Sequence, residues 1–318
     1  MRLKHPWLVG SLGAVVFVLV ASCGARAADF VVHEWGTFTT HHGLDGEPYV
    51  WSPLQAVSDL PTFVYEAKSR ATRKDTFPGT VRMETPVLYV YAGARQTIAV
   101  NVGFPSGIIS EWYPRARWSW QGIRWPRVTI VPGVQAELLR EPEPSHYYPA
   151  REVDSTLVRC ATKRGTQYEK FLFYRGVGTF DTPVRVSLDG EVVQIRVVGS
   201  DVLGGVLLFE RRGDAVGFRA IDLPDYAVTV DRPVPAGDAI AGLEAALRAR
   251  LVAEGLYERE AQAMLDTWRD TWSEEGLRVL YIVPRRLTDD VLPLSIRPAP
   301  SSLVRVLVGR AEVKPPET

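Results

Sequence analysis

Residues 80–132 contain five short segments rich in Val, Ile, Thr and aromatic side chains, each separated from the next by Gly or Pro. β-Branched and aromatic residues fit a pleated surface, and strands at this spacing indicate an antiparallel sandwich or barrel. The pattern resumes at residue 169 and continues to residue 222, with hairpin-type turns at Asp189-Gly190 and Gly213-Asp214. The sequence therefore predicts a mainly antiparallel β fold that is sandwich-like or barrel-like.

The hydrophobic period changes once, between residues 238 and 272. Residues 238–254 and 258–272 each place apolar residues at the three- and four-residue spacing of one helical face, and Gly255 between them is a typical helix stop. We interpret the Met and Trp stripe of the second segment as ordinary core and not as a cofactor box. The predicted class is therefore α+β, with a C-terminal helical hairpin packed on the β core. The apolar positions are Ile240, Leu243, Leu247, Leu251, Ala261, Met264, Leu265, Trp268 and Trp272.

The N-terminus has the parts of a secretory signal, which we assign to residues 1–28. Arg2 and Lys4 precede an apolar run at residues 7–20, which is shorter than the roughly 20 residues that span a bilayer. A small-x-small cleavage site ends at Ala27, and residues 20–23 also resemble a lipobox in which Cys23 would carry a lipid anchor. Cleavage at the first site and lipidation at Cys23 both predict an exported chain that is periplasmic, envelope-associated or secreted. No later stretch is apolar enough to cross a membrane.

Removal of the signal leaves a chain that must be stabilised by its core. It takes away three basic residues and no acids, so the formal charge becomes 34 − 37 = −3. A weakly acidic chain has no general attraction to nucleic acid. Cys160 is then the single cysteine, so there is no internal disulfide framework. We expect one compact unit made of an N-terminal β region at 29–140, a second β region at 141–235, and the helical hairpin with terminal strands at 236–318.

Four histidines remain after the signal, and the spacing of three of them limits their roles. His33 and His41 are eight residues apart in a predicted strand, which is roughly 26 Å. They cannot share an ion unless the chain folds back between them. His41 and His42 lie beside the turn at residues 43–46, and we interpret them as a solvated pair.

His33 and Glu34 point to opposite faces of a strand because side chains alternate, although Gly36 makes a bulge possible. Any site that uses His33 therefore needs partners from distant parts of the sequence. Two histidines and one or two carboxylates suit a divalent metal ion with an open position. The alternative is a core histidine whose nitrogens are satisfied by backbone groups. The candidate partners are Glu84, Glu111, His146, Glu169 and Arg175.

Two charged residues lie next to apolar strands. Glu84 precedes the apolar segment 87–91, where a carboxylate must be solvated, paired or coordinating. Arg175 ends the segment 171–175 and is followed by Gly176 and Gly178, so backbone N–H groups there could approach a ligand. An arginine at such a position suits a carboxylate, sulfate or phosphate. A structural ion pair is the alternative for both residues.

Tryptophans and arginines alternate between residues 117 and 127. Trp118 and Trp120 share one face of a predicted strand. This cluster could stack on sugars or bind a polyanion, and buried cross-strand packing is the alternative. Its members are Arg117, Trp118, Trp120, Arg124, Trp125 and Arg127.

Four sequence blocks resemble those of an uncharacterised family of exported bacterial proteins, and the likeness extends over nearly the whole mature chain. The resemblance implies no particular activity, but it implies that the blocks form one site. They are His33-Glu34-Trp35-Gly36-Thr37-Phe38-Thr39, Met83-Glu84-Thr85-Pro86-Val87, His146-Tyr147-Tyr148 with Pro149-Ala150-Arg151, and the Glu169 to Gly178 segment that contains Phe173-Tyr174-Arg175-Gly176-Val177-Gly178.

These observations leave enzyme and binding functions open. The sequence lacks the nucleophile elbow, the His-Glu-x-x-His motif, the P-loop and the dinucleotide fingerprint. The first hypothesis is a metal-assisted hydrolase or oxidase with His33, Glu84 and His146 as ligands of a divalent ion. Glu34 would then act as the base, and Arg175 would bind an anionic group. The alternatives are a non-catalytic envelope protein that binds a glycan, peptide or small molecule, and a structural or assembly partner.

Overall fold

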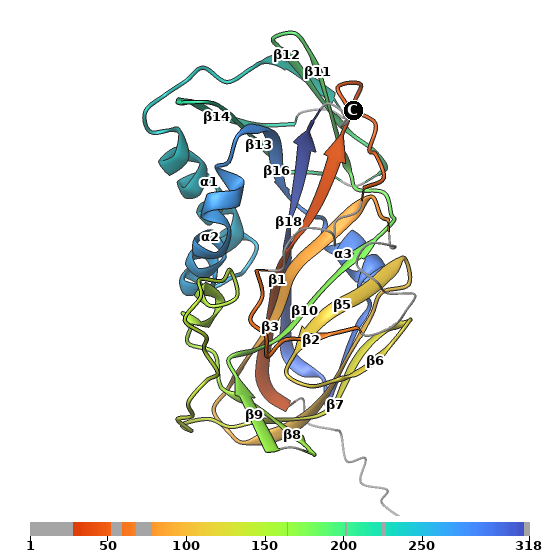
Figure 1. Ribbon diagram of the computed structural model, residues 1–318, viewed down its shortest axis with the longest axis vertical. Coiled ribbons are helices and arrows are strands. Elements are labelled where there is room, and N and C mark those ends of the chain that lie inside the picture. Colours follow the sequence, from red (N-terminus) through yellow and green to blue (C-terminus); the bar gives the residue numbers. More distant parts are fainter. Residues whose placement is uncertain are drawn as a thin grey trace, which may run out of the picture.

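The computed structural model describes residues 28–51, 59–67, 78–163, 165–200, 202–223 and 227–314. All of the predicted signal except Ala28 lies outside the described residues, and so does Cys23. The described residues form three sheets, three α-helices and a short 3-10 helix, Pro149–Arg151. Figure 1 shows the two longer helices on one side of a large central sheet.

The central sheet has nine strands and brings together both ends of the described chain. β1 pairs antiparallel with β3 and parallel with β18, with Trp35 opposite Val87 on one side and Val306 on the other. All other pairs in this sheet are antiparallel. Its strands, in spatial order, are β14 (Ala215–Ile221), β13 (Val206–Arg212), β16 (Gly276–Ile282), β18 (Pro300–Val313), β1 (Ala28–His42), β3 (Val81–Ala92), β10 (Phe171–Gly178), β5 (Gly107–Tyr113) and β2 (Tyr65–Glu66).

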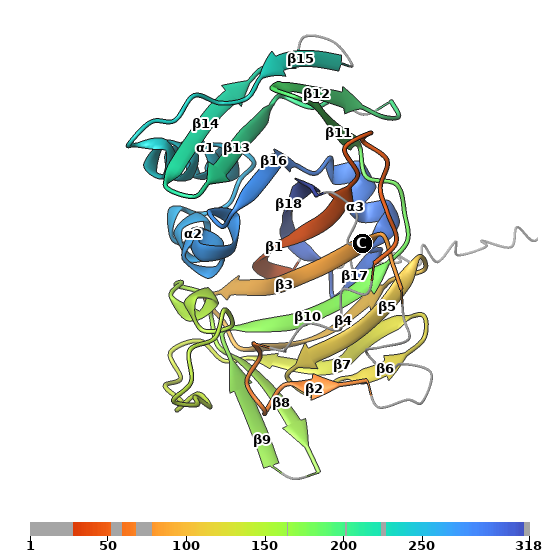
Figure 2. The same ribbon diagram turned by 45° about the horizontal axis from the view of Figure 1, so that its top comes forward.

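Two smaller antiparallel sheets pack on one side of the nine-stranded sheet (Figure 2). The six-stranded sheet has the order β17 (Leu294–Arg297), β4 (Gln96–Gly103), β7 (Gly122–Ile130), β8 (Val158–Thr162) and β9 (Gly165–Glu169), and β6 (Arg117–Ser119) pairs with β7. The three-stranded sheet consists of β11 (Val184–Asp189), β12 (Val192–Val197) and β15 (Ala227–Asp231).

Alternation of side chains along the central strands creates two cores. Val32, Leu88 and Leu172 point toward the smaller sheets and pack with residues such as Val128. Trp35, Tyr89 and Phe171 point the other way and pack with the helices. A strand that is buried on both faces is apolar throughout, which explains the continuous apolar run of residues 87–90.

The predicted helical hairpin is confirmed. α1 (Ala239–Ala253) and α2 (Glu258–Trp272) pack on the nine-stranded sheet, and Trp268 and Trp272 are only 5% and 2% exposed. Glu260 caps α2 by accepting a hydrogen bond from the Tyr257 backbone N–H. The third helix, α3 (Arg285–Val291), was not anticipated.

The mainly antiparallel β architecture is confirmed as stacked open sheets, and the described strands form no closed barrel. Pro48 and Trp51 make isolated bridges to His42 and Gly79. In the described part of the chain, no helix is both long and apolar enough to cross a membrane.

Candidate functional site

Three of the four sequence blocks lie side by side at the centre of the nine-stranded sheet, because β1, β3 and β10 are consecutive in its strand order. The pairing register shifts at the same level of these strands, at Gly36, at Thr85 and before Gly176. Thr85 has a φ of 45°, and it is the only described residue other than glycine with positive φ. Bulges and unfavourable backbone angles are common next to functional sites. A functional site could therefore lie beside this line of bulges.

Gly176 and Gly178 lie inside β10 and not in a loop at its exit, contrary to the sequence interpretation. A Cβ atom on Gly176 would lie 2.2 Å from the Ile108 carbonyl oxygen, and one on Gly178 would lie 2.7 Å from the Ser106 carbonyl oxygen. These glycines therefore allow close approach of the neighbouring backbone, not of a ligand.

Arg175 and Glu84 lie beside the line of bulges, and each is paired with a side chain of opposite charge. Arg175 bonds to Glu111 with an Nη2–Oε1 distance of 3.1 Å and to Asp59 with an Nη1–Oδ1 distance of 3.2 Å. Glu84 accepts a hydrogen bond from the Thr39 hydroxyl at 2.8 Å and pairs with Arg82 at 3.1 Å. Each side chain is nearly buried and each has its charge compensated, which fits the structural ion-pair alternative for both Glu84 and Arg175.

His146 joins this network to α2. Its Nδ1 lies 2.6 Å from Asp59 Oδ2, its Nε2 lies 2.9 Å from Asp270 Oδ2, and its ring stacks on Trp268. The hydrogen bond to Asp59, with a second to Asp270, raises the pKa of His146 to about 9 against the effect of burial. Burial alone would raise the pKa of Asp59, but the bond from His146 and the charge of Arg175 hold it well below its usual range. His146 is thus a charged link between three segments.

His33 and Glu34 point to opposite sides of β1, as alternation predicts. His33 Nδ1 lies 2.7 Å from Glu260 Oε2, and the other oxygen of Glu260 accepts a hydrogen bond from Tyr91 at 2.7 Å. His33 is therefore a core histidine held by a carboxylate and not, as in the sequence alternative, by backbone groups. Glu34 is fully buried and bonds to the Tyr174 hydroxyl at 2.5 Å and to Arg305 Nε.

The structure does not bring His33, Glu84 and His146 together, so the expectation that they share one ion is wrong. Glu84 pairs with β1 at Thr37, four residues and roughly 13 Å along the strand from His33. His33 and His146 contact α2 at Glu260 and Asp270, which are ten residues or roughly 15 Å apart along the helix. No three His, Cys, Asp or Glu side chains among the described residues are grouped as a metal site requires.

His41 and His42 are not a solvated pair. β1 continues through both because it pairs with β18 as far as His42 and Val313. His42 is fully buried, and His41 stacks on Trp51 with ring centroids 4.1 Å apart. Burial lowers the pKa of each imidazole to about 4.

The six-stranded sheet differs from the nine-stranded sheet in the balance of its charged residues. Its strands contain five arginines and a single acid, Glu169, which is fully buried and bonded to Arg151 and Tyr147. None of the five forms an ion pair with a described residue. Four of them are exposed, and Arg159 is half-buried. We call this surface the outer arginine face and define it by Arg117, Arg124, Arg127, Arg159 and Arg297.

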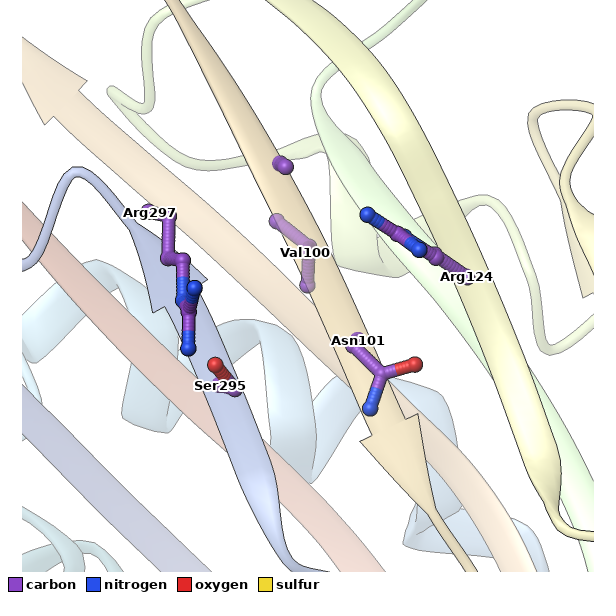
Figure 3. Close-up of a pocket in the computed structure, with 6 residues that line it drawn as sticks. Val100, Asn101, Arg124, Ser295 and Arg297 are labelled. Carbon is purple, nitrogen blue, oxygen red and sulfur yellow. The ribbon is translucent and has the colours of Figure 1, made fainter.

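A cavity of about 330 Å³ opens on this face between β17, β4 and β7 (Figure 3). Arg124 and Arg297 stand on either side of it, and Asn101 and Ser295 lie between them. Sequence reasoning found Arg124 but missed the other three. β17 and β4 are nearly 200 residues apart in the chain and pair only in the fold, with Ser295 opposite Asn101.

The tryptophans predicted to cluster here have different exposures. Trp125 is buried and bonds to the Pro114 carbonyl oxygen, which matches the packing alternative. Trp118 is half-buried and stacks on Trp112, and it donates to the Ile109 carbonyl oxygen. Trp120 is 50% exposed at the turn between β6 and β7.

Comparisons with known proteins add no function. No family model matches the chain, and no curated protein is significantly similar to it in sequence. Among solved structures, it is similar to the Fcho1 Mu homology domain of Danio rerio with bound Eps15 peptide, at 8% identity and a TM-score of 0.35. The match covers 91% of this chain and 98% of that one.

Proposed function

We propose that the protein is a non-catalytic binding protein whose ligand is anionic and docks on the outer arginine face. One observation carries the proposal: the arginines of the six-stranded sheet lack carboxylate partners among the described residues, whereas the buried arginines of the nine-stranded sheet are paired. Surface guanidinium groups without acids create a positive potential that attracts anions.

The arrangement of these arginines has an energetic cost in the free protein. Arg117 and Arg124 are direct cross-strand partners, and like charges at such positions destabilise a sheet. No acid among the described residues offsets this repulsion by an ion pair. An anion bound between the guanidinium groups would replace it with attraction, so the surface is suited to a ligand and not to stability.

The cavity between Arg124 and Arg297 supplies the chemistry of recognition. Two guanidinium groups match the planar fork of a carboxylate or the oxygens of a sulfate or phosphate. Asn101 and Ser295 provide neutral donors and acceptors between them. This combination favours an anionic group attached to a molecule that also carries hydroxyl groups.

The two residues expected to take part in catalysis are already bonded to other side chains, which favours a binding function over a catalytic one. Glu34, the expected base, is fully buried and bonded to Tyr174 and Arg305. Arg175, the expected anion-binding residue, already holds Glu111 and Asp59. The metal-assisted hydrolase or oxidase hypothesis would need these groups to exchange their partners, and the binding proposal needs no such change.

Calorimetric titration of the purified protein with galacturonate, sulfate and phosphate tests the proposal. We expect one of these anions to bind the parent, and Arg124→Gln with Arg297→Gln to weaken that binding at least about tenfold, the effect of losing about 1.4 kcal/mol. Arg259→Gln is the matched control, because Arg259 is exposed and paired with Asp154 on another surface. The proposal fails if the parent binds none of the three anions, or if the double variant binds them as tightly as the control.

A further inference from the structure

A second basic cavity adjoins the first, and together they suggest what kind of anion binds. This cavity has a volume of about 420 Å³, and four basic side chains line it: Arg115, Arg117, Arg127 and Lys163. No Asp or Glu among the described residues lines either cavity. Two neighbouring sites of one charge sign on one surface suit a ligand that carries several negative charges.

The second cavity lies at a gap in the sheet. β6 pairs with β7 as far as Arg124, and β8 pairs with it from Thr129 onward. Neither β6 nor β8 pairs with residues 125–128 of β7 on this side. The gap leaves an open notch beside Pro126 and Arg127, so an elongated ligand can enter the sheet surface there.

The two cavities are joined by the Arg117 and Arg124 pair. Arg124 lines the first cavity and Arg117 lines the second, and the two residues are directly opposite on adjacent strands. From β17 across β4 and β7 to β6 there are three strand spacings, or roughly 14 Å. One ligand lying across the strands can therefore contact both cavities, which a single small anion cannot do.

We infer that the ligand is an acidic polysaccharide chain that lies across β17, β4, β7 and β6. Its acid groups pair with the arginines, and its hydroxyl groups bond to Asn101 and Ser295. This inference rests on the proposed function, because it names the class of the anion that docks on the outer arginine face.

The surface fits a polysaccharide better than two other polyanions. Single-stranded nucleic acid is bound by several aromatic rings on which successive bases stack, and Trp120 is the only exposed large apolar side chain among the described residues of β6, β7 and their connecting turn. A membrane surface requires an apolar face that enters the lipid headgroup region, and the described residues of β17 and β4 include no exposed large apolar side chain.

A length series of oligogalacturonates tests the inference. Contact with both cavities makes the second contact intramolecular, so we expect an oligomer long enough to span them to bind at least about 100-fold more tightly than galacturonate. Arg115→Gln with Lys163→Gln changes two basic side chains that line the second cavity and are not members of the outer arginine face. This variant should remove most of the gain while leaving the affinity for galacturonate nearly unchanged. Added salt should weaken the long oligomers most, because more charge pairs are screened.

The outcomes separate the two proposals. Galacturonate binding that depends on Arg124 and Arg297 but does not tighten with oligomer length overturns the extended ligand and leaves the proposed function in place. The polysaccharide is also overturned if polyuridylate or vesicles with phosphatidylglycerol bind more tightly than the longest oligogalacturonate at equal salt and lose binding in the same variants. Absence of binding to every anion overturns both.

Discussion

The nine-stranded and six-stranded sheets both contain arginines, but the two groups of arginines differ in burial and in whether a carboxylate pairs with them. In the nine-stranded sheet Arg175, Arg278, Arg305 and Arg310 are at most 6% exposed, and each is paired with a carboxylate. In the six-stranded sheet the outward arginines have no described acid partner. Arginine is thus buried and paired in one sheet, and mostly exposed and without a described acid partner in the other.

Burial explains this difference. Transfer of a guanidinium group from water into a core costs several kcal/mol unless a charge and hydrogen bonds compensate it. The central sheet is covered on both faces, so an arginine there must be accompanied by an acid. The outer face of the six-stranded sheet has no such requirement. An unpaired arginine inside would be strongly destabilising, whereas unpaired arginines on the outer face remain in contact with water.

The largest expected effect is the loss of a buried pair. Arg305→Met leaves the fully buried Glu34 with the Tyr174 hydroxyl as its remaining partner. We expect the free energy of unfolding to fall by about 3–5 kcal/mol, measured by chemical denaturation. The matched control is Arg259→Met at an exposed pair, where a loss below about 1 kcal/mol is expected. Equal losses in the two variants would contradict the distinction between paired core arginines and exposed ones.

A smaller loss is expected at Gly176, where β10 lies close to β5. In Gly176→Ala the new Cβ would lie 2.2 Å from the Ile108 carbonyl oxygen, so the backbone must shift. Overpacking of this kind costs about 1–3 kcal/mol or more. Gly93→Ala is the control, because beyond its chain neighbours no described atom lies within 4 Å of the place that its methyl group would take. The stability of that control should change by less than about 0.5 kcal/mol. If Gly176→Ala keeps full stability but loses ligand binding, the glycine serves the ligand after all.

The local sequence pattern was sufficient to predict the helices and strands, but it was not sufficient to predict which strands pair with one another. The Leu and Trp spacing located α1 and α2 to within a residue because a helix buries a periodic face. The parallel pairing of β1 with β18 joins strands about 270 residues apart, and no local signal encodes it. Strand existence follows from composition, whereas strand order depends on the whole chain.

The same limit affected the candidate site. His33 and His146 were predicted to serve one site with each other, but their observed partners Glu260, Asp59 and Asp270 are 87 to 227 residues away in the sequence. Their closeness in the sequence did identify Arg117, Arg124 and Arg127 as members of one cluster. Arg297 completes the first cavity from β17, which becomes adjacent only when the sheet forms.

The charged link at His146 predicts a pH dependence of stability. The folded-state pKa, about 9, is above the ordinary value of 6.5. The link therefore stabilises the fold fully below pH 6.5, and this contribution is lost as pH rises through about 9. We expect about 1 kcal/mol in all, because the Asp270 side chain is 70% exposed and the interaction is screened. Denaturation curves from about pH 6 to about pH 10 should show this decline in the parent and a flatter profile in His146→Gln. Parallel profiles would contradict the assignment.

The smallest effect on stability is expected on the outer arginine face. Arg124→Gln removes one member of the like-charged pair with Arg117 and breaks no ion pair with a described residue. The free energy of unfolding should therefore change by less than about 0.5 kcal/mol, or rise slightly as repulsion is relieved.

Addition of oligogalacturonate provides the contrast, because a ligand that binds the folded state stabilises it by mass action. The melting temperature of the parent should rise with ligand concentration, and that of the variant should rise much less. A loss of more than about 2 kcal/mol without ligand would mean that Arg124 is structural, and the two sheets would then use their arginines alike.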